Sequence, residues 1–144
     1  MNIEVRRATF EDSDPLFSLV ESFVTSFKPD RNAFQHSLRQ LLCDDSVLMN
    51  VSVFQNEIVA YCLAFDHYTF YANGRVTWIE EITVREDMRG KGIGKELMEH
   101  VERWAVSRKA GLIGLATRRA APFYLAMGYE ESAVFFRKMI EHER

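Results

Sequence analysis

A run of cationic and glycine residues in the middle of the chain has the composition of a phosphate-binding loop. The segment reads Arg89-Gly90-Lys91-Gly92-Ile93-Gly94. It follows a β-branched and aromatic stretch, Trp78 to Arg85, and leads directly into a helical pattern. Backbone N–H groups at a helix start lack partners within the helix, so together with the cations they would bind a phosphate group. Glycine at positions 92 and 94 would keep a Cβ away from the phosphate oxygens, and the turn is expected to need positive φ.

Two adjacent carboxylates, Glu80 and Glu81, lie in the strand that precedes this loop. Because side chains alternate along a strand, Glu80 is expected on the face of Ile82 and Glu81 on the face of Ile79. The two carboxylates should therefore not point into one core. A carboxylate at the end of a strand can accept a proton or bind a cation, so both are candidates for chemistry beside the loop.

The composition is that of one globular domain. The 144 residues are 47 % hydrophobic and 12 % aromatic, which predicts a single domain over residues 1–144 with a well-filled core. The apolar runs are short and no charged-then-apolar leader is present, so neither a membrane span nor a secretory signal is expected. A net charge of -3 gives no reason to expect nucleic-acid binding. Cys43 and Cys62 are each expected to be small buried hydrophobes, which fits a cytoplasmic setting.

Periodicity and turn residues predict a mixed, mostly antiparallel sheet of about six strands with helices on both faces. The first helix is expected to continue through Val24 to Phe27, and Asn73-Gly74 is the stronger hairpin marker because both residues tolerate positive φ. A strand at 112–117 is expected to be buried on both faces. The predicted elements are a strand at 2–8, helices at about 12–27 and 30–43, strands at 46–55, 58–71 and 75–84, a helix from 93 to about 110, a strand at 112–117, a helix at 120–127 and a strand at 129–139.

This order, strand, two helices, three strands, helix, strand, helix, strand, resembles the GCN5-related N-acetyltransferase (GNAT) family. Taken alone, the glycine segment would fit a flexible turn that caps a helix about as well as a phosphate site. Two motifs at the family's usual separation carry the resemblance. Arg89, Gly92 and Gly94 match the family's Gln/Arg-x-x-Gly-x-Gly/Ala signature, and the segment from Ala120 to Tyr129 matches its A-x-x-F-Y-x-x-x-G-Y/F motif.

The resemblance implies that the chain binds acetyl-CoA as co-substrate and uses no metal. In the family the glycine loop holds the pyrophosphate, the strand before it splays away and pairs with the pantetheine arm, and the late helix contributes to the cofactor site. Many members have Asn where this chain has Thr117, which puts one hydrogen bond to the cofactor arm in question. The implied cofactor-binding residues are Ile82, Thr83, Val84, Arg89, Gly90, Lys91, Gly92, Ile93, Gly94, Lys95, Thr117, Phe123 and Tyr124.

Tyr124 matches the family's general acid, which protonates the CoA thiolate as it leaves. A phenol with a pKa near 10 is protonated at neutral pH and can donate. The alternative reading is a core tyrosine, since Phe123 and Tyr129 are also aromatic. By analogy with the family, a backbone N–H near Val84 would polarise the thioester carbonyl.

Acetyl transfer to an amine also needs a base, because an ammonium with a pKa near 10.4 costs roughly 4 to 5 kcal/mol to deprotonate at pH 7. The hypothesis is that Glu80 accepts this proton, directly or through water, while Glu81 helps to bind a cationic amine. The alternative is that either carboxylate is solvated or paired with Arg75 or Arg85. Which of the two acts as base stays open at this point.

The acceptor is expected to be a small molecule with a primary amine, with no nucleic-acid or membrane partner. The segment from Ser22 to Phe34 and the hairpin from Phe65 to Trp78 are expected to form its pocket, and His67 could line it. A homodimer through the late strands is expected from family habit. The rival from another class is an acyl-CoA sensor without chemistry, and a nucleotide-binding protein is weaker because the loop lacks the G-x-G-x-x-G spacing.

Overall fold

The computed structural model describes residues 1–23 and 27–142, and it contains one five-stranded sheet in the sequential order β1-β2-β3-β4-β5. The first four strands pair antiparallel with their neighbours, and β5 pairs parallel with β4. Mixed pairing of this kind is the predicted sheet class. The strands are β1 (Glu4–Arg7), β2 (Val47–Phe54), β3 (Glu57–Thr69), β4 (Gly74–Val84) and β5 (Ile113–Leu115).

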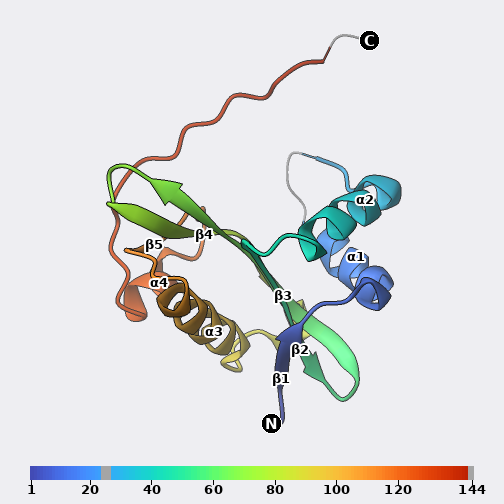
Figure 1. The fold of residues 1–144 in the computed structure, drawn as a ribbon. Coiled ribbons are helices and arrows are strands. Elements are labelled where there is room, and N and C mark those ends of the chain that lie inside the picture. Colours follow the sequence, from blue (N-terminus) through green and yellow to red (C-terminus); the bar gives the residue numbers. More distant parts are fainter. Residues whose placement is uncertain (24–26, 143–144) are drawn as a thin grey trace.

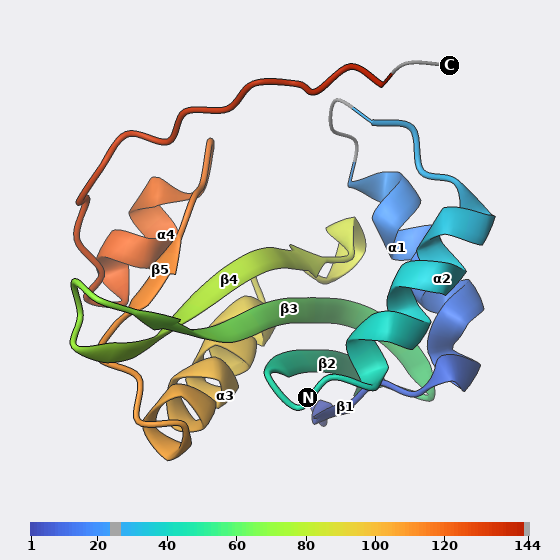
Figure 2. The same ribbon diagram turned by 45° about the horizontal axis from the view of Figure 1, so that its top comes forward.

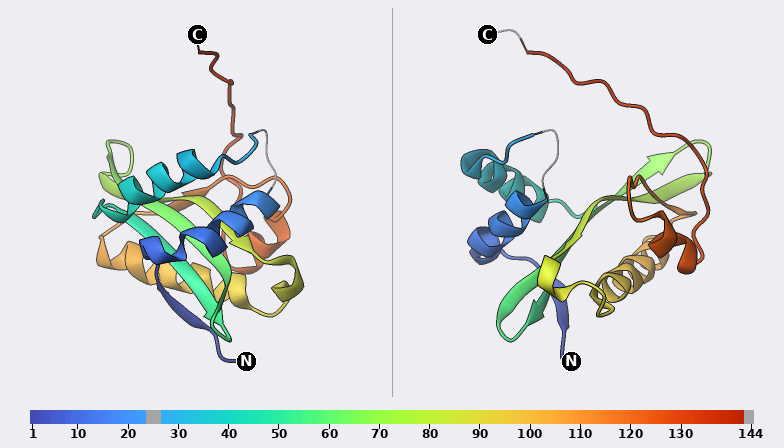
Figure 3. Two further views of the ribbon diagram at one scale, coloured as in Figure 1. Left: turned by 90° about the vertical axis from the view of Figure 1, so that its right-hand side faces the viewer. Right: turned by 180° about the vertical axis from the view of Figure 1, so that it is seen from behind.

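Helices cover both faces of this sheet, as the sequence predicts, and Figure 1 shows the two helical layers on either side of the strands. On one face α1 and α2 pack on Val47, Val51 and Leu63, while on the other α3 packs on Val59 and Cys62. The left view of Figure 3 shows α1 and α2 running across the sheet. The helices are α1 (Ser13–Ser22), α2 (Arg31–Leu42), α3 (Ile93–Ser107) and α4 (Ala121–Ala126), with short 3-10 turns η1 (Phe10–Asp12) and η2 (Glu86–Met88).

The two hairpins follow from residues that tolerate positive φ. Gln55 and Asn56 have φ of 51° and 63° between β2 and β3, and Asn73 and Gly74 have φ of 57° and 146° between β3 and β4. Asparagine and glycine reach this region at low steric cost. The hairpin predicted at Asn73-Gly74 is confirmed, and it fixes the register of the longest strand pair, β3 with β4.

Helix α3 carries the apolar spacing that the sequence shows after the glycine loop. Ile93, Leu97, Val101 and Ala105 lie four residues apart, on one face, and all are buried. Met98 completes the buried set. Burial of such a stripe fixes the start of α3, and with it the glycine loop, against β4.

Four predictions about local structure are wrong. Residues 129–139 do not form a strand in the described chain, because no neighbouring strand pairs with them, so the sheet has five strands. Helix α1 ends at Ser22, before the exposed Phe23, while Val24 lies outside the described residues. Strand β5 is only half-buried, and Cys43 is exposed just after α2. Cys62 is buried as expected, and burial raises the pKa of its thiol to about 12.

No helix in residues 1–23 and 27–142 is long and apolar enough to cross a membrane.

Candidate active site

The open edge of β4 is the feature around which the candidate site is built. Strand β5 pairs with Thr77, Trp78 and Ile79 only, although β4 continues to Val84. Beyond Ile79 the two strands separate, and Figure 2 shows β4 running away from β5 and α4. Backbone N–H and C=O groups on that edge of β4 therefore have no strand partner within the described chain, and an extended ligand can take the partner's place.

A β-bulge at Glu80 marks the point where the strands separate. Leu63 pairs with Glu81 while the next residue, Ala64, pairs with Ile79, so Glu80 is the extra residue. A bulge bends its strand and breaks the alternation of side chains. As a result Ile79 packs in the same core as Ile82, against α3, and the predicted strict alternation through Glu80 is wrong.

Positive φ is expected in the glycine loop, where the sequence analysis names Gly92 and Gly94, and of these two glycines only Gly92 has it. Gly92 has φ of +84° and caps the N-terminus of α3 in the left-handed region, and Gly90 also has positive φ, at +76°. A side chain is strained in this region at a cost of about 1 to 2 kcal/mol. Open space surrounds the Cβ positions of both glycines. Gly94 lies inside the first turn of α3, so positive φ does not explain it.

Arg89 and Met88 fix the loop to the end of β4. The Nε of Arg89 donates a hydrogen bond to the carbonyl oxygen of Val84 at 3.0 Å, and Met88 is buried in the core beneath α3. Lys91 and Lys95 are exposed on either side of the helix start. The amide groups of a first helical turn, the helix dipole and nearby cations are features with which proteins bind anions.

The close approach of Phe123 to Gly94 brings together the two motifs, which are far apart in the sequence. A Cβ at Gly94 would lie 3.5 Å from the ring of Phe123 and 3.8 Å from the side chain of Val84. The first turn of α3, the end of β4 and the late helix α4 therefore meet at one point. Thr117 lies before α4, and its Oγ1 accepts a hydrogen bond from the N–H of Ala120 at 3.1 Å, so its hydroxyl takes part in holding the start of α4.

Tyr124 is buried in α4, on the α3 side of the sheet. Its ring packs edge-on against Phe123 and Tyr129, with centroid distances of 5.0 Å and 5.8 Å. Burial raises the pKa of its phenol, so the hydroxyl stays protonated throughout the neutral range. The phenol makes no hydrogen bond to another described residue, which leaves its proton available to a ligand.

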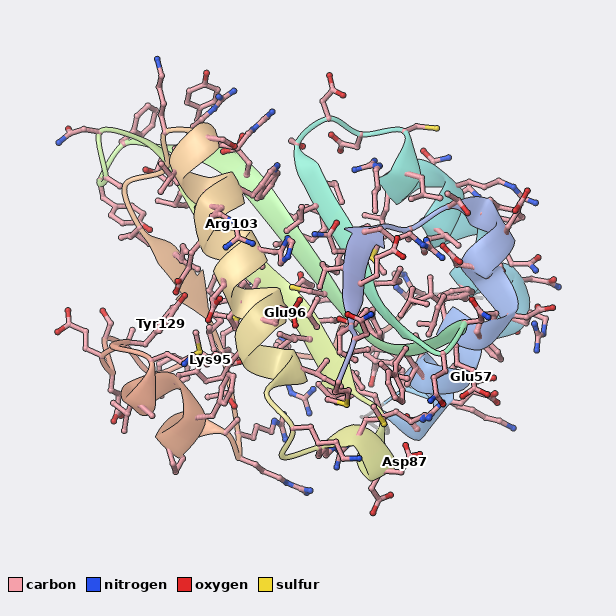
Figure 4. The ribbon with its side chains drawn as sticks, turned by 90° about the horizontal axis from the view of Figure 1, so that it is seen from below. Glu57, Asp87, Lys95, Glu96, Arg103 and Tyr129 are labelled. Carbon is pink, nitrogen blue, oxygen red and sulfur yellow. The ribbon has the colours of Figure 1, made fainter. Side chains whose placement is uncertain are left out.

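Tyr129 fixes α4 to α3. Its Oη donates a hydrogen bond to Glu102 at 2.9 Å, and Figure 4 shows Tyr129 and Lys95 on the side of α3 that faces the α4 segment. Burial and the Glu102 carboxylate both raise the pKa of the Tyr129 phenol. Between the two helices lies a groove of about 450 Å³, lined by Lys95, Glu99, Glu102, Phe123, Ala126 and Met127. Among its lining residues, Lys95 belongs to the first turn of α3.

Glu81 points to the opposite face of the sheet, toward the α1 and α2 side, and has a partner that sequence reasoning missed. Tyr61 donates a hydrogen bond from its Oη to Oε1 of Glu81 at 2.8 Å, and burial is the main cause that raises the pKa of this phenol. Across the strand pair Tyr61 lies opposite Thr83. The register of two adjacent strands brings these residues together, so spacing within one strand gives no sign of the contact. Glu80, in contrast, is exposed.

The arginine partners considered for the two carboxylates bind elsewhere. Arg85 forms ion pairs with Glu57 and Asp87, at 2.8 Å and 2.6 Å. Figure 4 shows Glu57 and Asp87 on the side of α3 away from Tyr129. Arg75 lies 3.5 Å from Asp66, a buried carboxylate that also accepts a hydrogen bond from Arg108.

The expected acceptor pocket is brought together only in part. Its first segment, Ser22 to Phe34, includes positions 24–26, which lie outside the described residues. The tip of the β3–β4 hairpin is seven residues along β4 from Glu81, roughly 23 Å at strand spacing, so it does not reach that carboxylate. His67 is exposed on this hairpin. The described residues contain no group of His, Cys, Asp or Glu that could hold a metal ion.

Comparison with known proteins decides the family. The family model for GNAT acetyltransferases matches residues 13–129, which include the strand, the glycine loop and α4. The chain belongs to the GNAT acetyltransferase family. An aminoalkylphosphonate N-acetyltransferase of Salmonella typhimurium is 29 % identical over 141 residues, which are 95 % of this chain and 91 % of that protein.

Solved structures share the fold. A transcriptional regulator from Bacillus halodurans has a TM-score of 0.86 at 21 % identity, over 96 % of this chain and 100 % of its own. A glucosamine-6-phosphate N-acetyltransferase from Arabidopsis thaliana also has a TM-score of 0.86, at 18 % identity, over 98 % of this chain and 100 % of its own. At these identities the likeness concerns the GNAT fold, including the mixed sheet with helices on both faces.

GNAT acetyltransferases use acetyl-CoA as co-substrate, and the residues of this chain fit that molecule. The open edge of β4 can pair with an extended amide-containing arm, and the start of α3 with its cations can bind a pyrophosphate. Lys95, near that helix start, also lines the groove between α3 and α4. The open edge of β4 and the start of α3 lie next to each other, as the binding of one elongated ligand requires.

We expect Gly92→Glu to weaken acetyl-CoA binding by more than about tenfold, because a carboxylate at the helix start repels the pyrophosphate and about 1.4 kcal/mol of repulsion suffices. Calorimetric titration measures the Kd. The matched control is Gly74→Glu, which adds the same charge at another glycine of positive φ with open space around it, on the β3–β4 hairpin. Normal binding by a folded Gly92→Glu protein would refute the loop as the pyrophosphate site.

Proposed function

We propose that this chain transfers an acetyl group from acetyl-CoA directly to the primary amine of a small molecule. The observation that carries the proposal is the close approach of Phe123 and Val84 to Gly94, because it brings the start of α3, the open strand edge and the helix of Tyr124 together. Family membership supports an acetyltransferase, and the Salmonella relative is named as an N-acetyltransferase. An amine is therefore the acceptor class to test first.

The proposed binding roles follow the three surfaces of the site. The backbone of Ile82, Thr83 and Val84 pairs with the pantetheine arm along the edge that β5 leaves open. Residues 89–95 hold the pyrophosphate with their amides and cationic side chains. Thr117 and Phe123 line the third surface of the site, at the start of α4. A backbone N–H near Val84, on the part of β4 that follows the bulge at Glu80 and has left β5, would stabilise negative charge on the thioester oxygen.

We assign the proton donor to Tyr124 and the proton acceptor to the carboxylates of β4. Glu80, directly or through water, takes a proton from the ammonium, and the freed amine attacks the thioester carbonyl carbon. The C–S bond then breaks, and Tyr124 gives its proton to the sulfur so that CoA leaves as a thiol. The acetylated nitrogen loses a second proton that restores the phenol, and the carboxylate passes its proton to water.

Glu81 is proposed to bind the amine, and Tyr61 to position Glu81. A carboxylate that accepts a hydrogen bond from a buried phenol has fewer rotamers available, so it presents its second oxygen in a fixed direction. Because the Salmonella relative is named for aminoalkylphosphonates, small primary amines of that type are the first acceptors to examine.

A thiol-release assay with acetyl-CoA tests the function. The purified protein is screened against aminoalkylphosphonates, polyamines, amino acids, peptides and aminoglycosides, and mass spectrometry identifies the acetylated product. We expect turnover with one class of small primary amine and an N-acetyl product. Acetyl-CoA binding without turnover on any of these amines would contradict the proposal and favour an acyl-CoA sensor.

We expect Tyr124→Phe to lower kcat by roughly 10²-fold or more with little change in acetyl-CoA affinity, because only the donated proton is lost. Steady-state rates and calorimetry measure the two quantities. The matched control is Tyr71→Phe, which removes a hydroxyl from an exposed tyrosine on the β3–β4 hairpin. An unchanged kcat in Tyr124→Phe would remove Tyr124 from the mechanism.

Tyr61→Phe is expected to raise the KM for the amine by roughly fivefold to tenfold while the Kd for acetyl-CoA stays the same. The reason is that Glu81 loses the donor that holds it, a change worth about 1 to 1.4 kcal/mol in binding. If Tyr61 had a purely structural role, Tyr61→Phe would instead lower thermal stability and would not raise the KM for the amine relative to the Kd for acetyl-CoA. Equal KM values for the wild type and the variant would refute the positioning role.

A further inference from the structure

Arg85 links two segments of the chain at the end of β4. Its Nη1 donates a hydrogen bond to Oε2 of Glu57 at 2.8 Å. Its Nε and Nη2 donate to the two carboxylate oxygens of Asp87, at 2.6 Å and 3.2 Å. Glu57 is the first residue of β3, just after the β2–β3 hairpin turn, and Asp87 lies in η2, the turn that leads into the glycine loop. One guanidinium therefore joins the β2–β3 hairpin to the turn before the loop.

Asp87 places a negative charge close to the glycine loop. It is exposed and lies four residues before Lys91. The hydrogen bonds from Arg85 are the main reason why the pKa of the Asp87 carboxyl lies below its usual range, and the positive charge of Lys91 lowers this pKa too. The carboxylate is therefore ionised at neutral pH and lies within electrostatic range of Lys91. A charge of this sign opposes the binding of an anion by the same lysine and helix start.

The contact with Arg85 occupies both oxygens of the Asp87 carboxylate. Two N–H···O bonds from one guanidinium fix the plane and the direction of a carboxylate. Figure 4 shows Asp87 and Glu57 on the side of α3 away from Lys95. Lys91 forms no ion pair within residues 1–23 and 27–142, so its charge is available to a ligand. The loop thus keeps its cations for an anion although a carboxylate lies next to it.

We propose that Arg85 is a positioning residue for acetyl-CoA binding, because it holds the carboxylate of Asp87 on the side of the β2–β3 hairpin. Held there, Asp87 neither pairs with Lys91 nor repels the pyrophosphate. The inference rests on the proposed role of residues 89–95 as the pyrophosphate site. Arg85 itself touches no ligand in this scheme, and its whole effect on affinity runs through Asp87.

Other roles for Arg85 would depend differently on Asp87. If the positive charge of Arg85 attracted the ligand directly, its loss would weaken binding equally with and without the Asp87 carboxylate. If the bond between the two side chains only supported η2, Asp87→Asn would weaken binding as much as Arg85→Gln. The backbone of Arg85 is held separately, since its N–H donates to the carbonyl oxygen of Val59 at 2.7 Å. A double-mutant cycle therefore separates the three roles.

Calorimetric titration with acetyl-CoA at low ionic strength tests the inference on the wild type, Arg85→Gln, Asp87→Asn and the double variant. We expect Arg85→Gln to raise the Kd about threefold to fivefold, the effect of one exposed charge, while Asp87→Asn and the double variant stay within about twofold of the wild type. The matched control is Arg39→Gln, which removes one positive charge from an exposed position of α2 and should leave the Kd unchanged. Circular dichroism checks that each variant is folded.

Salt gives a second readout that a purely structural role would not move. Raising NaCl to about 0.5 M shortens the screening length to roughly 4 Å, so the difference in Kd between Arg85→Gln and the wild type should largely disappear. A difference that persists at high salt would overturn the inference. So would equal Kd values for Arg85→Gln and the wild type, a loss of affinity in Asp87→Asn alone, or a double variant as weak as Arg85→Gln.

The variant Gly92→Glu, titrated under the same conditions, separates this inference from the proposed function. If Gly92→Glu loses affinity while Arg85→Gln binds like the wild type, the loop remains the pyrophosphate site and only the role of Arg85 is refuted. If Gly92→Glu binds acetyl-CoA normally, the assignment of the loop is wrong and the role of Arg85 is refuted with it.

Discussion

The separation of β4 from β5 is the constraint on which the rest of the site depends. Parallel pairing with β5 stops after Ile79, where the bulge at Glu80 bends β4. The strand then continues to Val84 paired with β3 alone, and its other edge has no strand partner among the described residues. Unpaired backbone groups of a strand are costly unless water or a ligand binds them. The fold therefore keeps a row of amide and carbonyl groups ready for an extended ligand, and it places the start of α3 at the end of that row.

The charges of the site divide between the two faces of the sheet. On the α3 side, Lys91, Lys95 and the helix start favour an anion, and Tyr124 is held neutral because burial raises the pKa of its phenol. On the other side, Glu81 is held by Tyr61 and would favour a cation. Under the proposed function, an acyl donor with a pyrophosphate and an acceptor with an ammonium group would approach from opposite faces of β4, near the bulge where β4 and β5 separate.

Much of this fold could be predicted from local patterns in the sequence, because residue spacing and steric preference determine these parts of the structure. The hairpin at Asn73-Gly74, the apolar stripe of α3 and the left-handed Gly92 all follow from spacing and steric rules. The bulge at Glu80 and the bond between Tyr61 and Glu81 could not, since both arise from the register of β4 against β3. The strand predicted at 129–139 does not form, because a segment with high β propensity becomes a strand only when another strand lies beside it. That pairing, too, cannot be read from the local sequence.

Hydrogen–deuterium exchange of the full chain, with and without saturating acetyl-CoA, tests the central claim most directly. The account predicts that the ligand slows exchange at amides 82–84 on the open edge of β4 and at amides 90–95 of the loop and first helical turn. Amides of α2, on the far side of the sheet, should change little. Unchanged exchange at both β4 and the loop under saturating ligand would contradict the account, because the ligand would then lie elsewhere on the molecule.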